Sequence, residues 1–413
     1  MPRPRSSLLV VVVAAAALMG LFAVPATSQS PSMEDGPVGF AHSTTGGAGG
    51  ERYRVTNLDD AGPGSLREGV ERAGPTIIEF EVSGTIRPEQ TLMVGADKTV
   101  DGRGAQVTIG GRGMTLTQPN VIVRNLFFAE VTPSDILQDA IHIEGARNVW
   151  IDHNSMTGAG DKLIGMESGT DVTISWNWFH NQFQVIQLGT FSTADAARDI
   201  RVTLHHNLFT DNGYRHPRAS YGKIHAFNNY VRNWQVHGMS AVRGAELASE
   251  ANIFEAGADK DATVITGVKN DRDDTPGFIR SVGDLALSGA VIRQNEPERV
   301  FNPAGSYRYT ASPATDALRN QILVEAGVQG AIKPATPNVP TAVPPQRQNR
   351  AGEGRNNKQQ QQQPPAAPAP EDKPSSGGFP FVAVLVVAGV LAAAVGGGLA
   401  LRARTRSRDR PSS

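Results

Sequence analysis

Four acidic residues in the central part of the chain have the chemistry of metal ligands. They are Asp139, Glu144, Asp161 and Glu167. Carboxylate oxygens are the ligands that hard cations such as Ca²⁺ prefer. If the fold brings these side chains together, they could bind such a cation. The alternative, which the residue types alone favour, is that each one is a solvated carboxylate on the surface.

Four basic residues of the same region could contact an acidic partner. They are Lys162, Arg215, Arg218 and Lys223. An arginine binds a carboxylate through two parallel hydrogen bonds, and a lysine binds it as a point charge. Such residues in one region suit a polymer that carries carboxylates.

Four histidines are numerous enough to suggest zinc: His205, His206, His216 and His225. However, they do not follow the His-Glu-x-x-His spacing that places two ligands on one face of a helix. We therefore favour a surface or stacking role for them over a zinc site.

Composition excludes several kinds of chemistry. The chain has 413 residues and no cysteine, so thiolate metal sites, disulfides and thiol nucleophiles are absent. The formal net charge is −1, which does not indicate a nucleic-acid partner. We also find no convincing carboxylate pair of the kind that glycosidases use for hydrolysis.

An internal repeat determines how these residues must be positioned. Segments that start at Val149, Val172 and Val202 each begin with a β-branched residue, continue as a short strand and carry Asn five residues after the start. Related asparagines recur at intervals of roughly 22 to 30 residues, which is the period of a solenoid. These positions are Asn125, Asn154, Asn177, Asn207, Asn229 and Asn252.

Short strands at this period, with no helical pattern between them, predict an all-β parallel β-helix. Each turn of such a solenoid lies on the turn before, so equivalent side chains stand next to one another. We expect the asparagines to stack as an internal ladder with a structural role, because an Asn amide can hydrogen-bond local backbone. Residues on the outer strands would line a site long enough for a polymer, here a carbohydrate.

The N-terminal part carries two further signals. Residues 1–28 have a basic start, an apolar core and small residues for cleavage, which predicts a secretory signal peptide. An uncleaved anchor is the alternative. The solenoid domain is then expected at residues 29–332. Ser65 and Glu68 form a capping box, which predicts a helix that ends near Gly74 and covers the first turn.

The C-terminal part changes character in three steps. Residues 303–332 suggest a short cover over the solenoid. Residues 333–378 are rich in Pro, Gln and Ala and predict a disordered linker. Residues 379–401 are apolar and uncharged, which predicts a transmembrane helix. The arginines of residues 402–413 then predict a cytoplasmic tail, and the domain would be displayed outside the cell.

Several motifs resemble those of the large pectate/pectin lyase family of bacterial polysaccharide lyases. The run Asn148 to His153 resembles the family's Asn-Val-Trp-Ile-Asp-His signature. Further similar segments follow in the family's order. They are Asp161 to Gly165, Val172 to Asn177, Leu188-Gly189, His205 to Phe209, Arg215 to Arg218 and His225 to Asn229. Together with upstream segments, the resemblance covers about Gly39 to Glu255.

The resemblance implies a right-handed, single-stranded parallel β-helix that cleaves polygalacturonate by β-elimination. It implies that calcium binds the uronate carboxylate and that an arginine removes the C5 proton. Arg215 falls on the position of this base, Asp139 and Asp161 on positions of calcium ligands, and Gln184 on the position of a substrate-binding lysine. With Arg218 and Lys162 added as substrate contacts, we expect a monomer that acts on an acidic polysaccharide.

Three residues depart from the family pattern. Gly165 replaces a second acidic residue, if one residue is deleted before Val172, Gln184 replaces a lysine, and Ser220 replaces an arginine. Loss of a carboxylate should weaken calcium binding, because affinity follows the charge of the ligands. Loss of the lysine and the arginine removes two charge-assisted contacts to a uronate.

Two other functions stay open at this point. The three departures support a non-catalytic, carbohydrate-binding β-helix. The linker and membrane segment support a structural or adhesive surface protein, for which deletion of the linker would abolish the role. A requirement for calcium in turnover would separate a lyase from a binding protein.

Overall fold

The computed structural model describes residues 36–131, 138–190, 199–257, 263–266 and 275–328. The chain divides into two compact units, Met1–Glu353 and Gly354–Ser413, and every described residue lies in the first. The predicted signal peptide, linker, transmembrane helix and basic tail lie outside the described residues. Within the described part, no helix is both long and apolar enough to cross a membrane.

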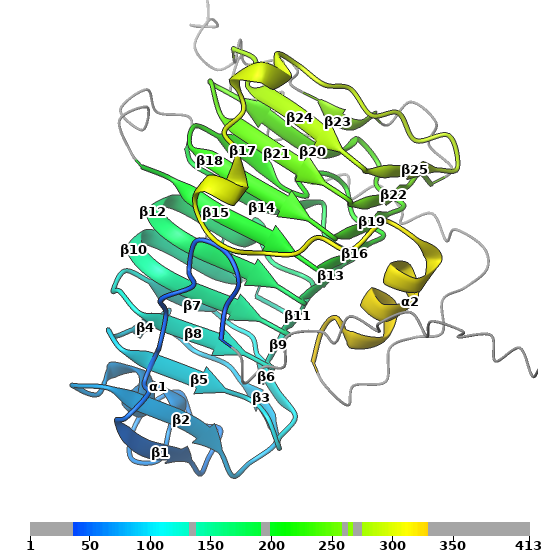
Figure 1. Ribbon diagram of the computed structural model, residues 1–413. Coiled ribbons are helices and arrows are strands. Elements are labelled where there is room, and N and C mark those ends of the chain that lie inside the picture. Colours follow the sequence, from blue (N-terminus) through cyan, green and yellow to red (C-terminus); the bar gives the residue numbers. More distant parts are fainter. Residues whose placement is uncertain (1–35, 132–137, 191–198, 258–262, 267–274, 329–413) are drawn as a thin grey trace, which may run out of the picture. The chain divides into compact units, whose positions relative to one another are not determined.

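Parallel strands form a solenoid with three faces, and each turn adds its strands to those of the turn before (Figure 1). Two faces are joined into one 16-stranded sheet because the long strands β10 and β12 run round the corner between them. The third face is a separate 9-stranded sheet. The predicted all-β parallel solenoid is therefore confirmed for the described residues.

Face 1 contains β4 (Leu92–Val94), β7 (Met114–Leu116), the first parts of β10 (Ile141–Asp152) and β12 (Lys162–Ser175), β14 (Gln184–Leu188), β17 (Arg218–Ser220), β20 (His237–Val242) and β23 (Thr263–Thr266). Face 2 contains β1 (Glu51–Val55), β2 (Thr76–Phe80), β5 (Lys98–Asp101), β8 (Val121–Arg124), the ends of β10 and β12, β15 (Arg201–His205), β18 (Lys223–Phe227), β21 (Glu246–Glu250) and β24 (Phe278–Val282). Face 3 contains β3 (Gly84–Ile86), β6 (Val107–Ile109), β9 (Phe127–Phe128), β11 (Ser155–Met156), β13 (Trp178–His180), β16 (Leu208–Thr210), β19 (Tyr230–Arg232), β22 (Ile253–Glu255) and β25 (Leu285–Leu287).

The repeat seen in the sequence corresponds to the strands of face 2, whose equivalent residues pair in register. Val149 pairs with Val172, Val172 with Val202, and Val202 with Ile224. These residues are fully buried. Each strand therefore starts with an apolar side chain that packs on its equivalents in the turns above and below.

The asparagine ladder is confirmed for five of the six predicted residues. Asn154 donates from its side chain to Oδ1 of Asn177 at 3.1 Å, and the same pattern continues to the end of the ladder through Asn207, Asn229 and Asn252. All five side chains are fully buried, and a buried amide is costly unless it is hydrogen-bonded. The ladder provides hydrogen-bond partners for the side-chain amides and for the backbone groups of the neighbouring turns.

Asn125 is the exception, and its predicted place in the ladder is wrong by one residue. The ladder position of that turn is occupied by Leu126, whose backbone amide donates to Oδ1 of Asn154 at 3.0 Å. Asn125 instead takes the preceding position, where it has a φ of +56°. His153, Trp176 and His206 occupy that same left-handed position in later turns, so Asn is suited to it by its tolerance of positive φ.

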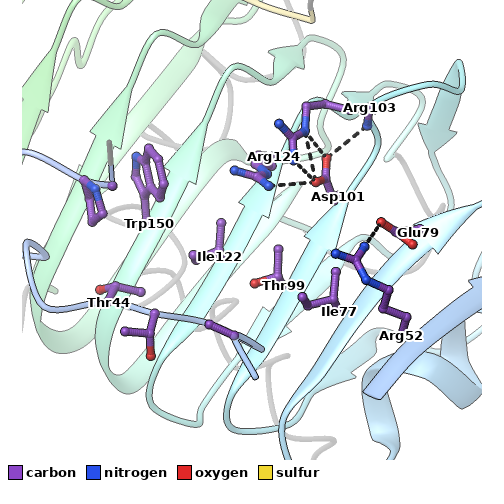
Figure 2. A pocket seen from close by; sticks show the side chains of 14 residues that line it. Thr44, Arg52, Ile77, Glu79, Thr99, Asp101, Arg103, Ile122, Arg124 and Trp150 are labelled. Atoms are coloured by element: carbon purple, nitrogen blue, oxygen red, sulfur yellow. Dashed lines mark hydrogen bonds and ion pairs between the residues drawn. The ribbon is translucent and has the colours of Figure 1, made fainter. Parts of the chain in front are cut away.

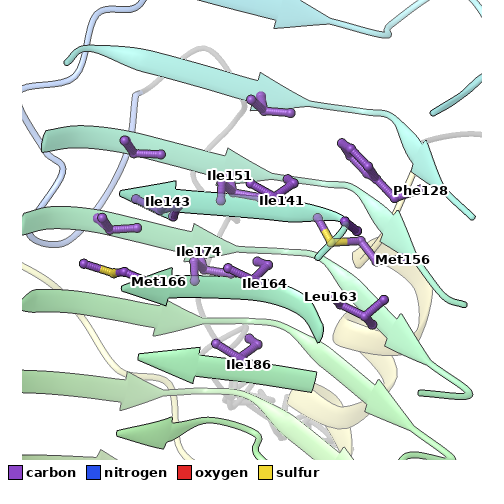
Figure 3. Close-up of a cluster of buried hydrophobic side chains, with 14 of the residues drawn as sticks. Phe128, Ile141, Ile143, Ile151, Met156, Leu163, Ile164, Met166, Ile174 and Ile186 are labelled. Atoms are coloured by element: carbon purple, nitrogen blue, oxygen red, sulfur yellow. The ribbon is translucent and has the colours of Figure 1, made fainter. Parts of the chain in front are cut away.

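Aliphatic side chains fill the interior in continuous stacks. Ile141, Ile164 and Ile186 follow one another through three turns behind face 1, and Ile151 and Ile174 do so behind face 2 (Figure 3). All are fully buried. Each such side chain contributes roughly 1.5 to 3 kcal/mol by its burial, so the interior holds the strands that carry the polar outer residues.

The first turns are covered by helix α1 (Leu66–Glu71). The hydroxyl of Ser65 accepts a hydrogen bond from the Glu68 amide at 3.2 Å, so the predicted cap is confirmed. The helix buries Leu66 and Val70 against the solenoid. It ends at Glu71, three residues before the predicted end.

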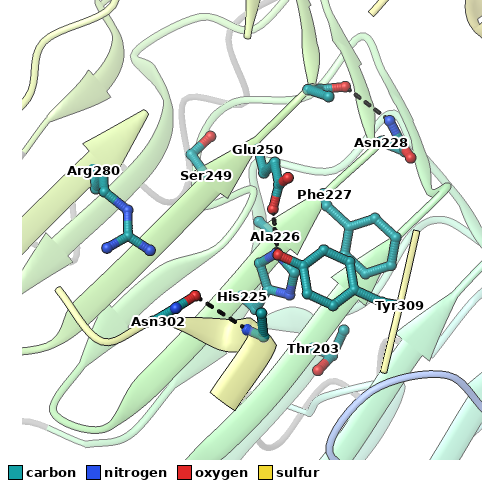
Figure 4. Close-up of polar contacts among 12 residues, drawn as sticks. Thr203, His225, Ala226, Phe227, Asn228, Ser249, Glu250, Arg280, Asn302 and Tyr309 are labelled. Carbon is teal, nitrogen blue, oxygen red and sulfur yellow. Dashed lines mark hydrogen bonds and ion pairs between the residues drawn. The ribbon is translucent and has the colours of Figure 1, made fainter. Parts of the chain in front are cut away.

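The C-terminal cover is confirmed for the described residues up to Val328. It contains the short helices η2 (Pro297–Arg299) and η3 (Pro303–Gly305) and helix α2 (Asp316–Glu325). The segment crosses face 2, where Tyr309 donates to Glu250 at 2.6 Å beside His225 (Figure 4). Helix α2 then packs Leu318 and Ile322 against face 3. Face 1 is the side that this segment does not cross.

Candidate active site

Face 1 carries a row of outer residues at equivalent positions of successive turns. The register pairs His142 with Gly165, Gly165 with Gln187, and Gln187 with Arg218. The strand neighbours of His142, Ile141 and Ile143, are fully buried. Because side chains alternate between the two sides of a strand, this row points away from the core.

Asp139 and Asp161, the two predicted metal ligands, are held by one lysine. The Lys162 ammonium lies 3.1 Å from Oδ1 of Asp139 and forms a second, close ion pair with Asp161. Oδ1 of Asp139 also accepts a hydrogen bond from the Lys162 backbone amide at 3.1 Å. The side chain of Asp139 is only 7% exposed. The structure thus brings together both carboxylates and a predicted substrate contact.

His142 joins this cluster, and the sequence did not single it out. Its Nδ1 lies 2.9 Å from Oδ2 of Asp139. The hydrogen bond to Asp139 raises the pKa of His142 despite the opposing effect of burial. Both carboxylate oxygens of Asp139 therefore have partners. The signal that could have revealed His142 is its place as the outer residue between two buried isoleucines.

Gly165 lies directly against this cluster. A Cβ atom at this position would stand 1.8 Å from Oδ2 of Asp139 and 3.0 Å from Cε of Lys162. Because Gly165 has no side chain, the Asp139 carboxylate can occupy this space. The glycine at residue 165, which departs from the family pattern, therefore allows the side chains of Asp139 and Lys162 to lie where they do.

Arg215, the predicted base, lies two turns further along. It has a φ of +70°, and 6% of the residue is exposed. Its guanidinium carbon lies 4.7 Å from the centre of the Tyr214 ring, and Nη1 donates to the side-chain oxygen of Gln184. Gln184 pairs in register with Lys162. Gln184 therefore lies between the turn of the lysine and the turn of the arginine.

Arg218 is held deeper in the same face. Nη1 donates to the Ser220 hydroxyl at 2.7 Å and lies 3.4 Å from Oε1 of Gln187. Arg218 is 3% exposed. The departure at Ser220 thus supports Arg218, and Gln187 is a further polar neighbour that the sequence did not single out.

The remaining candidates of the sequence do not enter this site. Glu144 and Glu167 are exposed carboxylates, as the alternative interpretation expected, and Lys223 is exposed at the start of a face 2 strand. No group of three or more acidic, His or Cys side chains that could hold a metal ion occurs among the described residues. Three of the four histidines stack on aromatic rings instead, and His216 meets the Phe209 ring edge to face at 5.4 Å.

The stacking of the histidines confirms the preferred interpretation. His206 lies parallel to Trp176 with ring centres 4.3 Å apart, and His205 and His225 flank Phe227 at 4.9 and 4.8 Å. Burial lowers the pKa of His206 to about 3. These rings are neutral packing elements of face 2.

A pocket of about 310 Å³ lies on face 2, and the residues of the face 1 cluster do not line it. Ile77, Thr99, Ile122 and Trp150 form one wall, and Thr44 of the N-terminal segment lies opposite (Figure 2). Asp101 lines it as well and is held by Arg103 and Arg124 at 2.7 and 2.8 Å. It contains none of the predicted site residues.

A sequence profile described as pectate lyase matches residues 7–331. Pectate lyase 1 of Juniperus ashei is 34% identical over 318 residues, which cover 69% of this chain and 87% of that protein. The chain belongs to the pectate lyase family. Pectate lyase 1 of Cryptomeria japonica is also 34% identical, over 291 residues that cover 63% of this chain and 77% of the relative.

Solved structures agree with this membership. The crystal structure of the major allergen from cedar pollen superposes with a TM-score of 0.62 at 30% identity and covers 71% of this chain and 92% of its own. A Bacillus pectate lyase in complex with trigalacturonate has a TM-score of 0.56 at 22% identity, over 71% of this chain and 99% of its own, and supports the fold. Our pectate lyase homologue is an enzyme of the carbon–oxygen lyase class that acts on polysaccharide.

The residues of this pectate lyase do not fit the calcium ion that its family generally uses. Calcium takes six to eight oxygen ligands and binds more tightly as their charge rises. Among the described residues, Asp139 and Asp161 are the carboxylates that contact one another's partners here, and both already bind the Lys162 ammonium. Gly165 supplies none, and His142 occupies the second oxygen of Asp139. Calcium therefore stays a prediction that this arrangement does not favour.

Proposed function

We propose that the protein cleaves a pectate-like acidic polysaccharide by β-elimination at face 1, with Arg215 as the base. Membership of the family supports the reaction class. The trigalacturonate bound by the related Bacillus enzyme supports an acidic substrate. The observation that carries the residue assignment is the grouping of Lys162, Gln184 and Arg215 on three consecutive turns of one face.

The basic residues of face 1 suit a chain of uronates. Successive turns of a solenoid lie about 4.8 Å apart, so a polymer that crosses several turns meets one polar side chain after another. Lys162, Gln184 and Arg218 are proposed to bind carboxylates and hydroxyls of the sugar units. An arginine can bind a carboxylate through two hydrogen bonds.

Arg215 is proposed to remove the proton from C5 of the uronate. Arg215 is 6% exposed and rests against the Tyr214 ring. These contacts, together with the hydrogen bond that Nη1 donates to Gln184, hold the guanidinium in one orientation, and the proton taken from C5 passes to solvent afterwards.

The proposed reaction balances without any redox partner. The C5–H bond breaks, its electron pair forms the C4–C5 double bond, and the C4–O bond breaks. The glycosidic oxygen leaves with a proton from water. The products are a new reducing end and an unsaturated uronate end. The proposed steps involve no calcium ion, because the residues of the cluster do not fit one.

The test is to identify the products that the full-length chain forms from polygalacturonate. We expect ultraviolet-absorbing oligosaccharides whose mass is one water lower than that of hydrolysis products. Saturated oligosaccharides would instead indicate hydrolysis. Binding of the polymer without any product would favour the non-catalytic, carbohydrate-binding interpretation.

The proposal includes the organisation of the whole chain. It assigns residues 1–28 to a signal peptide, 29–332 to the secreted domain, 333–378 to a linker, 379–401 to a membrane helix and 402–413 to a cytoplasmic tail. The apolar, uncharged run followed by arginines supports an anchored, extracellular enzyme. The domain itself is proposed to act as a monomer.

Cell fractionation tests this organisation. The full chain should remain with membranes after a high-salt wash, and a chain that ends at Ile332 should appear in the medium. Recovery in the medium of a chain that still contains residues 379–413 would contradict the anchor.

A further inference from the structure

The Lys162 side chain occupies the position between the two carboxylates that were expected to bind calcium. Its ammonium lies 3.1 Å from Asp139 and forms a second, close ion pair with Asp161. The three side chains are 16%, 7% and 21% exposed, respectively. A positive charge is therefore held within a partly buried acidic pair by the chain itself.

We infer that Lys162 supplies the positive charge of the reaction in place of a metal ion, so that turnover needs no divalent cation. This inference rests on the proposed β-elimination at face 1. It assigns to Lys162 a direct contact with the carboxylate of the uronate whose C5 proton is removed.

Residue 165 is the second observation that supports this role. A Cβ atom there would stand 1.8 Å from Oδ2 of Asp139 and 3.0 Å from Cε of Lys162. A carboxylate at residue 165 could therefore enter only if Asp139 and the lysine both moved. Asp139 and Lys162 thus fill the space that a third carboxylate would enter, and Gly165 leaves that space to them.

The charges of the cluster agree with a built-in cation. Asp139 and Asp161 together carry −2 and Lys162 carries +1, so a divalent ion would have to displace the ammonium to reach its ligands. Oδ2 of Asp139 is in addition engaged by Nδ1 of His142 at 2.9 Å. A site with two carboxylates, both already paired, lacks the oxygen ligands and the net charge that calcium needs.

The ammonium has the chemistry that the reaction requires. A lysine is a compact point charge with three donors, so it can keep one hydrogen bond to each aspartate and offer the third to a uronate oxygen. Charge that develops on the uronate carboxylate as C5 loses its proton would be stabilised at short range. The two aspartates act as positioning residues that orient the ammonium.

The inference predicts how the full-length chain responds to chelation. Formation of unsaturated product from polygalacturonate should change less than twofold between EDTA and added CaCl₂. Calorimetric titration with CaCl₂ should give no binding signal. Activity that EDTA abolishes and calcium restores would overturn the inference and leave the proposed function intact. No product under either condition, on any uronate polymer, would overturn both.

Three variants sharpen the test. Lys162→Met keeps the length of the side chain but removes its charge, and kcat should fall by about 10²- to 10³-fold. Lys162→Arg retains the charge and should keep more activity than Lys162→Met. If Lys162→Met loses no activity while its melting temperature stays unchanged, the lysine only pairs the two acids and the inference is wrong.

The double variant Lys162→Gly with Gly165→Asp removes the lysine side chain and places an acidic residue at position 165. Removal of the lysine side chain and rotation of Asp139 make room for a third carboxylate. We expect this protein to give a calorimetric calcium-binding signal that the unaltered chain lacks. Because binding is measured directly, this result does not depend on activity. Equal calcium binding by the double variant and the unaltered chain would contradict the mutual exclusion of lysine and metal.

Discussion

Faces 1 and 2 both carry polar outer residues but use them differently. On face 2, terminal segments cover the outer side chains: Phe40 and Ala41 donate backbone hydrogen bonds to Thr203 and Thr173 at 3.1 and 3.2 Å. On face 1, Lys162 pairs with Asp139 and Arg215 donates to Gln184, across turns that the C-terminal segment does not cross. Polar residue types alone thus do not separate a structural face from a candidate active face. The difference lies in what covers each face.

The C-terminal segment completes the network of face 2. The Tyr307 hydroxyl lies 2.8 Å from Oγ1 of Thr203 and 2.7 Å from Nδ1 of His225. Glu250 accepts from Tyr309 at 2.6 Å and lies 3.4 Å from Nε2 of His225. Mutations on this face should therefore reduce stability, whereas mutations on face 1 should reduce turnover.

The largest effect is expected from Arg215→Ala on face 1. Loss of a general base typically costs 10²- to 10⁴-fold in rate, so kcat on polygalacturonate should fall within that range. The melting temperature should change little. Arg218→Ala serves as the matched control and should mainly raise KM. Equal losses of stability and activity in Arg215→Ala would contradict the distinction between the two faces.

Acidification should destabilise the protein through the histidines of face 2. Burial lowers the pKa of His205, His206 and His225 below the usual value, to about 3 for His206. Below about pH 6.5 the unfolded chain binds protons that the folded protein does not, so stability falls as the pH falls. Each histidine accounts for at most about 1.4 kcal/mol per pH unit in this window.

Urea unfolding at pH 7.5 and at pH 5.5 measures this effect. His206→Phe keeps an aromatic ring beside Trp176 and removes one titrating group, so its stability should vary less steeply with pH. The hydrogen bond of Glu250 with His225 lowers the pKa of Glu250, which adds a further loss only below the normal range of a glutamate. Stability that is independent of pH across this window would show that these rings are not held neutral.

An intermediate effect is expected from Asn207→Ala in the buried ladder. Oδ1 of Asn207 accepts from the Asn177 backbone at 3.0 Å, and Nδ2 donates to the Ile174 carbonyl at 2.8 Å. Each buried group left without a partner costs about 1 to 3 kcal/mol. Chemical denaturation should show a loss of at least about 2 kcal/mol, with kcat of the folded protein unchanged. Asn320→Ala, at an exposed position of helix α2, is the control.

The smallest effect is expected from Tyr307→Phe in the covering segment. The change removes the hydrogen bonds of the hydroxyl with Thr203 and His225 but keeps the ring against Phe40. A single hydrogen bond contributes about 1 kcal/mol net. We expect a loss of that order and faster proteolysis of residues 301–312. Loss of activity without loss of stability would instead place a functional site on face 2.

The solenoid could be predicted because its signals are local and periodic. The β-branched residues that start the repeats pair with one another in the parallel register. The asparagines five residues later form the internal ladder. The capping box at Ser65 likewise depends on residues three positions apart. Asn125 was predicted one residue away from the true ladder position, which Leu126 occupies. Without an asparagine at that position, the sequence does not show which of the two adjacent residues belongs to the ladder.

The sequence suggested part of the proposed site, but it missed His142 and Gln187 and showed none of the contacts. Asp139 and Lys162 are 23 positions apart, and their meeting depends on the register of β10 and β12. The sequence therefore suggested Lys162 as a substrate contact and Asp139 as a metal ligand, without showing that they bind each other. The role of Gly165 could not be read either, because it depends on the space that the Asp139 side chain fills.

The most direct test of the account is the initial rate at which the purified, full-length chain forms unsaturated uronate ends on polygalacturonate in the presence of EDTA. The account predicts a steady rise in ultraviolet absorbance that Arg215→Ala reduces by at least about 100-fold and that added calcium leaves within twofold. No rise with EDTA or with calcium, from a folded protein that still binds the polymer, would contradict it.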